Sequence, residues 1–156
     1  MRRILIAVLA AASSPAGAQD VAEIADKTIV VKAGSTTSCY YVSPAGSVFE
    51  NSVITLGGKA LVRDGGGPAG AEFKIGGTHS YKLPQGGCEG TTTASLRGGV
   101  LSLHDRLQCP GAKTQSPPKD LRVEFRGGAC TARFRFGTPP SCRIVAGNQL
   151  ADCLQQ

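Results

Sequence analysis

The sequence predicts an all-β protein, an antiparallel meander that forms a small sandwich or barrel stapled by disulfides. Glycine pairs recur along the chain between short runs rich in Val, Ile, Thr and Phe. Gly-Gly adopts the positive φ angles of a tight hairpin turn at little cost, so strand, Gly-Gly and strand in succession indicate a β-hairpin. Turn signals of this kind recur about every ten residues, which predicts roughly eight to ten strands.

Residues 1–18 have the organisation of a secretory signal peptide. A basic start, a short apolar run and an Ala-Gly-Ala cleavage site follow one another before Gln19. The apolar run is too short to span a bilayer, so no membrane insertion is expected. We therefore expect residues 19–156 to be exported as a single domain, to the periplasm or the extracellular medium.

The charge of the chain is mildly basic. Loss of Arg2 and Arg3 with the signal peptide lowers the formal net charge from +6 to +4. Nucleic-acid-binding proteins concentrate basic residues on one surface with interleaved aromatics. Here the basic residues are spread among acidic ones, and the chain holds three Tyr, five Phe and no Trp. Together with the expected export, this argues against nucleic acid as a partner.

All six cysteines follow the predicted signal peptide, which favours disulfides in an oxidising compartment. Zinc sites need ligand pairs at C-x2–4-C spacing, and even Cys142 and Cys153, the closest pair, are farther apart. A C-x-x-C redox motif is also absent. We therefore predict no metal and no cofactor. The predicted disulfide cysteines are Cys39, Cys88, Cys109, Cys130, Cys142 and Cys153.

Before the hairpins, residues 21–26 (VAEIAD) favour either a helical turn or a disordered start. Two later segments, 62–73 and 109–120, are rich in Gly and Pro and are expected to be loops. The part from Pro110 to Asp120 is long enough to be a candidate binding or mobile segment, because long loops often carry function.

The segment 88–109 is predicted to be a hairpin that turns at Gly98-Gly99. Counting outward from the turn places Cys88 opposite Cys109 in a non-hydrogen-bonded pair. Cα atoms in such a pair lie roughly 4.5 Å apart, within the range of a disulfide, so we predict a Cys88–Cys109 bridge. The alternative is a β-bulge near Thr92 and Asp105, a polar pair in the otherwise apolar row, which would shift the register.

The same hairpin contains Ser102, His104 and Asp105, which suggests a hydrolase. On a strand, His104 and Asp105 point to opposite faces, so this Asp cannot orient this His as a catalytic triad requires. No G-x-S-x-G elbow is present. We favour a solvent-facing polar row and assign no catalytic residue. The alternative is a small hydrolase using His104, or His79 beside another turn, with a carboxylate such as Glu72 or Asp105.

The segment 120–135 is predicted to be a hairpin that turns at Gly127-Gly128, with apolar residues on one face and polar residues on the other. The polar face carries the candidate binding residues Arg122, Arg126, Arg133 and Arg135. Asp120 and Glu124 on the same face offset part of this positive charge. Guanidinium groups suit carboxylates and phosphates, which favours an anionic partner. The alternative is that the charges keep the sheet soluble and discourage pairing between sheet edges. Surface charge has this role more often than a role in binding.

At the C-terminus, Asn148 is expected to cap a short helix that Cys153 staples to the rest of the fold. Cys142 is the nearest partner of Cys153 in sequence, which leaves Cys39 to pair with Cys130. Sequence alone leaves three pairings open for these four cysteines.

These observations favour an exported, non-enzymatic binding or interaction module over an enzyme. The arginine face or the Pro110–Asp120 loop would contact an anionic glycan, another envelope polymer or a protein, including an enzyme that it inhibits. Sandwich folds host both binding proteins and enzymes, so the fold does not decide between the classes. An enzyme needs a pocket that holds a histidine and an acid within reach of one another.

Overall fold

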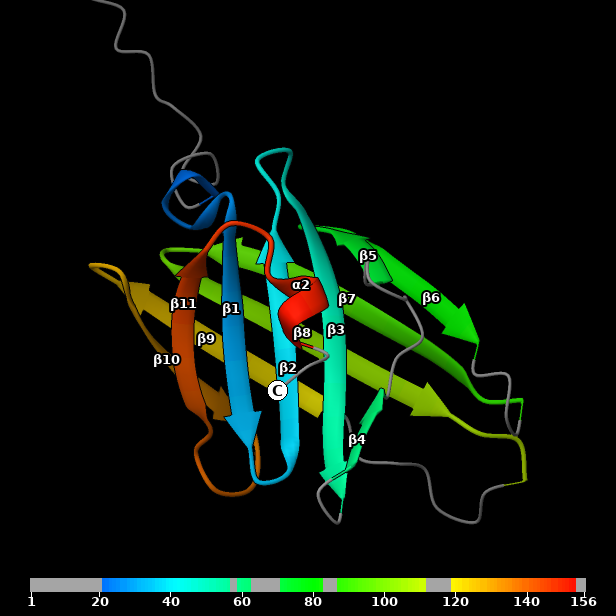
Figure 1. Cartoon of the computed structure of the whole chain (residues 1–156). Helices are drawn as coiled ribbons and strands as arrows, with labels where there is room; N and C mark the ends of the chain where they lie inside the picture. Colours follow the sequence, from blue (N-terminus) through cyan, green and yellow to red (C-terminus); the bar gives the residue numbers. More distant parts are fainter. Residues whose placement is uncertain (1–20, 57–58, 63–70, 83–86, 112–118, 154–156) are drawn as a thin grey trace, which may run out of the picture.

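The described strands form two antiparallel sheets in the computed structural model (Figure 1). The structure describes residues 21–56, 59–62, 71–82, 87–111 and 119–153. These residues contain eleven strands, slightly more than the eight to ten expected. The sheets are not closed into a barrel, so the all-β prediction is confirmed in its sandwich form.

The six-stranded sheet has the order β11-β1-β2-β3-β4, and β5 also pairs with β3. β3 is the longest strand, and its outer edge is shared between β4 along one half and β5 along the other. The strands of this sheet are β1 (Lys27–Ala33), β2 (Thr36–Val42), β3 (Ser47–Leu56), β4 (Lys59–Val62), β5 (Ala71–Lys74) and β11 (Ser141–Ala146).

The five-stranded sheet is a meander in the order β10-β9-β8-β7-β6. Its strands are β6 (Thr78–Lys82), β7 (Glu89–Arg97), β8 (Val100–Gln108), β9 (Lys119–Arg126) and β10 (Ala129–Phe134). Gly98-Gly99 and Gly127-Gly128 have positive φ and form the turns on both sides of the β8–β9 pair, as predicted. The hairpin expected at Gly76-Gly77 is wrong, because this pair lies between β5 and β6, which belong to different sheets.

The predicted Cys88–Cys109 bridge is confirmed. The β7–β8 ladder runs without a bulge from the turn to Glu89 opposite Gln108. The two cysteines follow directly, with their Cα atoms 4.1 Å apart and their sulfurs bonded. The polar pair Thr92 and Asp105 therefore stays in register, although it faces the interior.

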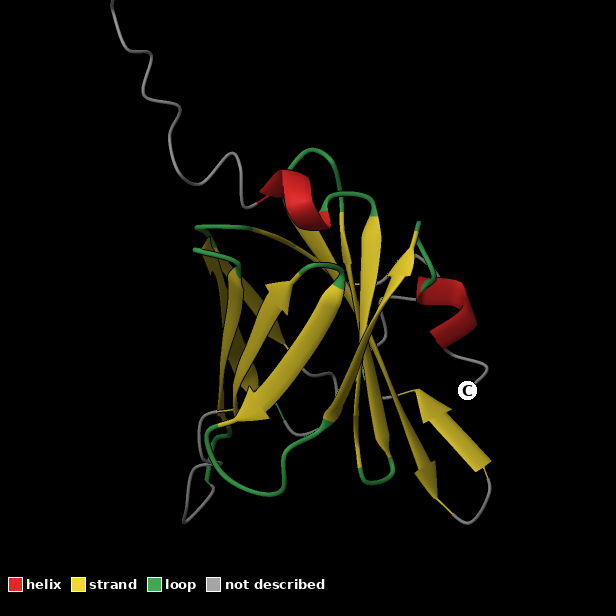
Figure 2. Ribbon diagram, turned by 90° about the vertical axis from the view of Figure 1, so that its left-hand side faces the viewer, coloured by secondary structure: helices red, strands yellow, loops and turns green. Residues whose placement is uncertain are grey.

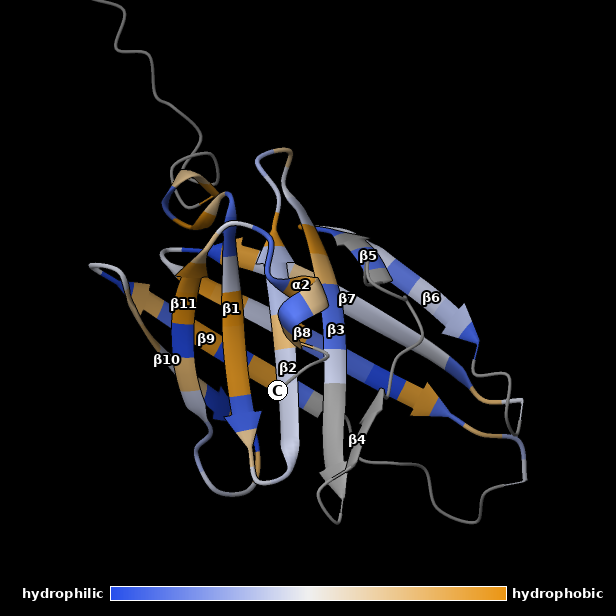
Figure 3. Cartoon of the chain, viewed as in Figure 1, coloured by the Kyte–Doolittle hydropathy of each residue, from blue (hydrophilic) through white to orange (hydrophobic). Residues whose placement is uncertain are grey.

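A core of apolar side chains from both sheets lies between them. Along β8 and β9, hydrophobic and hydrophilic residues alternate (Figure 3), because one face of this sheet packs on the core and the other faces solvent. The predicted helical turn is present at residues 21–24, and its Ile24 is fully buried in this core.

β1 is apolar along its middle rather than alternating, because both of its faces are covered. Ile29 and Val31 face the core, and Val30 faces a second cluster on the opposite side. That second cluster contains the short C-terminal helix α2 (Leu150–Cys153). Figure 2 shows α2 on the side of the six-stranded sheet that faces away from the five-stranded sheet.

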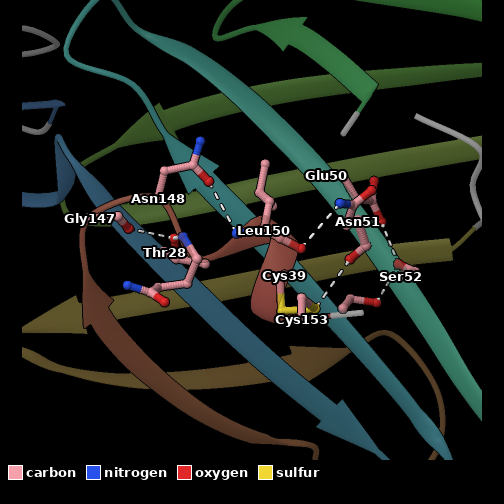
Figure 4. Close-up of a disulfide and its surroundings, with 11 residues drawn as sticks. Thr28, Cys39, Glu50, Asn51, Ser52, Gly147, Asn148, Leu150 and Cys153 are labelled. Carbon is pink, nitrogen blue, oxygen red and sulfur yellow. Dashed lines mark hydrogen bonds between the residues drawn. A yellow bond between two sulfur atoms is a disulfide. The ribbon is translucent and has the colours of Figure 1, made fainter. Parts of the chain in front are cut away.

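The predicted cap of this helix is confirmed (Figure 4). The backbone N–H of Leu150 donates to Asn148 Oδ1 at 3.1 Å. Thr28 on β1 anchors the approach to the helix, since its hydroxyl donates to Gly147 O at 2.7 Å and accepts from Gln149 N at 2.9 Å. These hydrogen bonds fix the turn before α2 and so position the helix against the six-stranded sheet.

The favoured pairing of the other four cysteines is wrong. The structure joins Cys39 to Cys153 and Cys130 to Cys142, rather than Cys142 to Cys153 and Cys39 to Cys130. The reason is the facing of the strands: Cys130 and Cys142 pack against the core, whereas Cys39 and Cys153 lie in the cluster on the opposite side of the six-stranded sheet. Cys142 and Cys153 are close in sequence, but they lie on opposite faces of the six-stranded sheet and therefore cannot form a disulfide.

The Cys130–Cys142 bridge joins β10 to β11, which are edge strands of the two sheets. Its Cα atoms are 5.7 Å apart, comparable to the spacing of neighbouring strands. The bridge therefore holds the two layers together along this side of the sandwich.

Candidate functional site

The two histidines lie on opposite faces of the five-stranded sheet. His79 on β6 is opposite Thr92, which is buried, and His104 on β8 is opposite Thr93, which faces outward. They therefore do not meet. Glu72 lies exposed on β5, in the other sheet.

His79 belongs to an inward-facing polar group, here called the inner cluster, formed by His79, Tyr81, Thr92 and Asp105. Asp105 Oδ1 accepts hydrogen bonds from the Tyr81 hydroxyl at 2.9 Å and from the Thr92 hydroxyl at 3.0 Å. The rings of His79 and Tyr81 stack with their centroids 6.4 Å apart. Asp105 is thus a hydrogen-bonded structural carboxylate rather than a partner of His104.

Gly90 makes room for this cluster, because the Tyr81 ring covers it. A Cβ atom at position 90 would lie 2.1 Å from Tyr81 Cζ. We expect Gly90→Ala to displace the ring and weaken its bond to Asp105, and so to lower the free energy of unfolding by about 2 kcal/mol in urea denaturation.

The control for Gly90→Ala is a double-mutant cycle. In a Tyr81→Ala background the collision is absent, so the same glycine substitution should then cost much less. An equal cost in both backgrounds would show that the Tyr81 ring is not the cause.

On the outer face, His104 lies at the centre of a charged network. Arg106 Nε donates to His104 Nε2 at 2.8 Å. Because a guanidinium only donates, Nε2 is the acceptor and the ring proton lies on Nδ1. Nδ1 donates to Asp120 Oδ1 on β9, directly across the ladder. Arg135 Nη1 approaches the other oxygen of Asp120 at 3.7 Å.

The carboxylate that orients His104 is therefore Asp120, not Asp105. A histidine oriented by a carboxylate is one requirement of a hydrolase. The other requirement is a free nitrogen to accept a proton from a nucleophile, and in His104 that nitrogen already accepts from Arg106. The network therefore suits a binding surface better than a general base.

Arg122, Arg126 and Arg133 lie on this outer face of the five-stranded sheet, and Arg135 directly follows β10 and reaches Asp120 on the same face. Arg122 is opposite Arg133 in the ladder, as predicted. Arg122 Nε also lies 3.3 Å from Glu124 Oε1, while both side chains remain about half exposed or more. Lys82 and Glu89 pair at 2.8 Å at the far edge, and this contact raises the pKa of Lys82 and lowers the pKa of Glu89 from their ordinary values.

We call the described outward positions of this sheet, together with Arg135 at the end of β10, the basic face. Its basic residues are Lys82, Arg97, Arg106, Arg122, Arg126, Arg133 and Arg135, and its acidic residues are Glu89, Asp120 and Glu124. Sequence reasoning found only the arginines of β9 and of the β10 end. Arg97 and Arg106 were missed, although the strand alternation in the 88–109 hairpin already placed them on the polar side.

Beside the β7–β8 and β9–β10 turns lies a hollow of about 400 Å³. It is lined by residues 98–100, 124–126 and 129–131. Most of the candidate Pro110–Asp120 loop, residues 112–118, lies outside the described residues.

Further features bear on the class of protein. In the described part of the chain, no cluster of three or more His, Cys, Asp or Glu side chains is arranged to hold a metal ion. No helix among the described residues is long and apolar enough to cross a membrane. The three disulfides indicate an oxidising environment outside the cytoplasm. Comparison with protein families, curated proteins and solved structures found no match.

Proposed function

We propose that this protein is an exported binding module that holds an anionic polymer on the basic face. The observation that carries this proposal is the charge of that face, where seven basic residues accompany three acidic ones. Figure 2 shows neither the helical turn at residues 21–24 nor α2 on this face. All seven basic side chains are exposed, so a partner can reach them.

The arrangement of the charges suits a polymer with repeated carboxylates or phosphates. Neighbouring strands lie about 4.8 Å apart and alternate residues on a strand about 7 Å apart, so the guanidinium groups form a two-dimensional array. Arg122 and Arg133 are directly opposite one another, and like charges in that position repel. An anion bound between them would relieve the repulsion.

The proposed function includes a location outside the cytoplasm. The predicted signal peptide, residues 1–18, lies outside the described residues. Together with the disulfides, its sequence supports the periplasm or the extracellular medium, where anionic envelope polymers occur. A protein partner, including an enzyme that this chain would inhibit, is the alternative occupant of the basic face.

The test is binding of the mature protein to polygalacturonate across a salt series. We expect Arg122→Ala/Arg126→Ala/Arg133→Ala to weaken binding roughly tenfold to a hundredfold at low salt, since each exposed ion pair contributes up to about 1 kcal/mol. Binding by the unmodified protein should weaken as salt rises, because exposed charges are screened.

A charge-matched control removes three basic residues from the other sheet, as Lys32→Ala/Lys74→Ala/Arg143→Ala. These exposed residues lie on β1, β5 and β11, so binding should be unaffected. Equal loss in both triple variants would show that net charge, rather than the basic face, decides binding. No binding by the unmodified protein would overturn the proposal.

A further inference from the structure

An exposed aromatic ring lies at the edge of the basic face. Phe136 is 70% exposed, and it is the one large hydrophobic side chain in the described part of the chain that is so strongly exposed. It lies between β10 and β11, in the segment that the Cys130–Cys142 bridge closes. A single exposed hydrophobic side chain is common on protein surfaces, so the surroundings of this ring decide what it can bind.

Arg135 ties this ring to the charged network. Its guanidinium carbon lies 5.3 Å from the centroid of the Phe136 ring. The same side chain reaches Asp120 Oδ2 at 3.7 Å, and the Arg135 backbone N–H donates to Asp120 O at 3.2 Å. Arg135 therefore links the ring to Asp120, and the backbone just before Phe136 is held by a hydrogen bond, which reduces the entropy lost when a ligand binds.

The surroundings of the ring favour a sugar over a protein as the ligand. Protein interfaces are built around a buried core of several apolar side chains. Phe136 has the guanidinium group of Arg135 beside it instead, and no second exposed hydrophobic residue of its size occurs in the described part of the chain. A pyranose ring presents C–H groups with partial positive charge, which are attracted to the negative face of an aromatic ring.

We infer that the anionic polymer is a glycan whose sugar ring stacks on Phe136. Arg135 and the neighbouring arginines bind the carboxylate or phosphate of that glycan. Arg135 lies over the phenyl ring, and because Phe136 is 70% exposed, the ring keeps surface that a sugar can contact. This inference rests on the proposed function and narrows its polymer to an acidic polysaccharide.

The experiment compares three polymers by their affinity for the mature protein. Polygalacturonate has sugar rings and carboxylates, polyglutamate has carboxylates without sugar rings, and dextran has sugar rings without charge. We expect polygalacturonate to bind about tenfold more tightly than polyglutamate, as one stacking contact implies. Dextran should bind weakly or not at all, because it lacks the charges that the arginines recognise.

Variants of Phe136 separate stacking from simple apolar contact. Phe136→Ala and Phe136→Leu should both lose the preference for polygalacturonate and keep the affinity for polyglutamate. Phe136→Tyr should restore the preference, since the aromatic face is retained. Thr138→Ala, an exposed change in the same loop, is the matched control and should leave both affinities unchanged.

The outcomes distinguish this inference from the proposed function. Equal binding of both acidic polymers, unaffected by Phe136→Ala, would leave the basic face as the site and overturn the glycan inference. Full retention of the preference in Phe136→Leu would overturn it as well, because a leucine offers apolar contact without an aromatic face and would instead suit a protein pocket. Binding of neither acidic polymer would overturn both proposals.

Discussion

Replacing Cys39 and Cys153 together by alanine is expected to lower the free energy of unfolding by about 4 to 5 kcal/mol. This disulfide closes a long loop, with a sequence separation of 114, and so restricts the unfolded chain strongly. It also holds α2 on the sheet. A four-residue helix is not stable alone in water, so the buried Leu150 should lose its packing when the bridge is absent. Urea denaturation under non-reducing conditions measures the change.

The matched control is Cys88→Ala/Cys109→Ala. That bridge has a sequence separation of 21, and its removal should cost about 3 kcal/mol because a shorter loop loses less entropy. A larger loss in the control than in the Cys39 and Cys153 variant would contradict the assigned role of the long bridge. Peptide mapping of the unreduced protein checks the pairing directly, and a peptide joining Cys142 to Cys153 would contradict it.

Leu101→Ala is expected to lower the free energy of unfolding by about 3 to 4 kcal/mol. Leu101 is fully buried, and in the ladders it is opposite Leu96 on one side and Val123 on the other. All three belong to the core between the sheets. Removal of the side chain would leave a cavity. Leu96 on β7 and Val123 on β9 could fill it only if the pairing of these strands with β8 shifted. Thermal and urea denaturation both measure this loss.

The control is its neighbour, Ser102→Ala. Ser102 points to the opposite face and is only half-buried, so we expect a change within about 0.5 kcal/mol. Similar costs for the two substitutions would contradict the alternation of faces along β8. Because the basic face depends on the same alternation, this comparison also tests which side chains of β8 are available to a ligand.

Much of the fold could be predicted because its information is local. In the 88–109 hairpin, the turn glycines set the register, and the register placed Cys88 opposite Cys109. The cap at Asn148 is likewise a contact between near neighbours in sequence. Side chains alternate between the faces of a strand, so the row of arginines beyond Gly127-Gly128 also followed from the chain itself.

The candidate site was predicted less completely, because several of its contacts cross between strands that are far apart in sequence. Asp120 meets His104 across the β8–β9 ladder. A long segment joins these two strands, so their register cannot be found by counting residues outward from a tight turn. Sequence reasoning therefore tested Asp105 as the partner of His104 and not Asp120. The exposure of Phe136 could not be predicted, because the sequence does not show whether a phenylalanine in a loop is buried or exposed.

Local signals were enough to predict the two hairpins at Gly98-Gly99 and Gly127-Gly128, their registers and which face of each is apolar. The covering of the six-stranded sheet on both faces, the cysteines that meet across the layers and the charges around His104 follow instead from contacts between residues far apart in sequence. The physical reason is the range of the interactions. Turn conformation and strand alternation depend on neighbouring residues, whereas the burial of a face depends on apolar surface that residues distant in sequence supply.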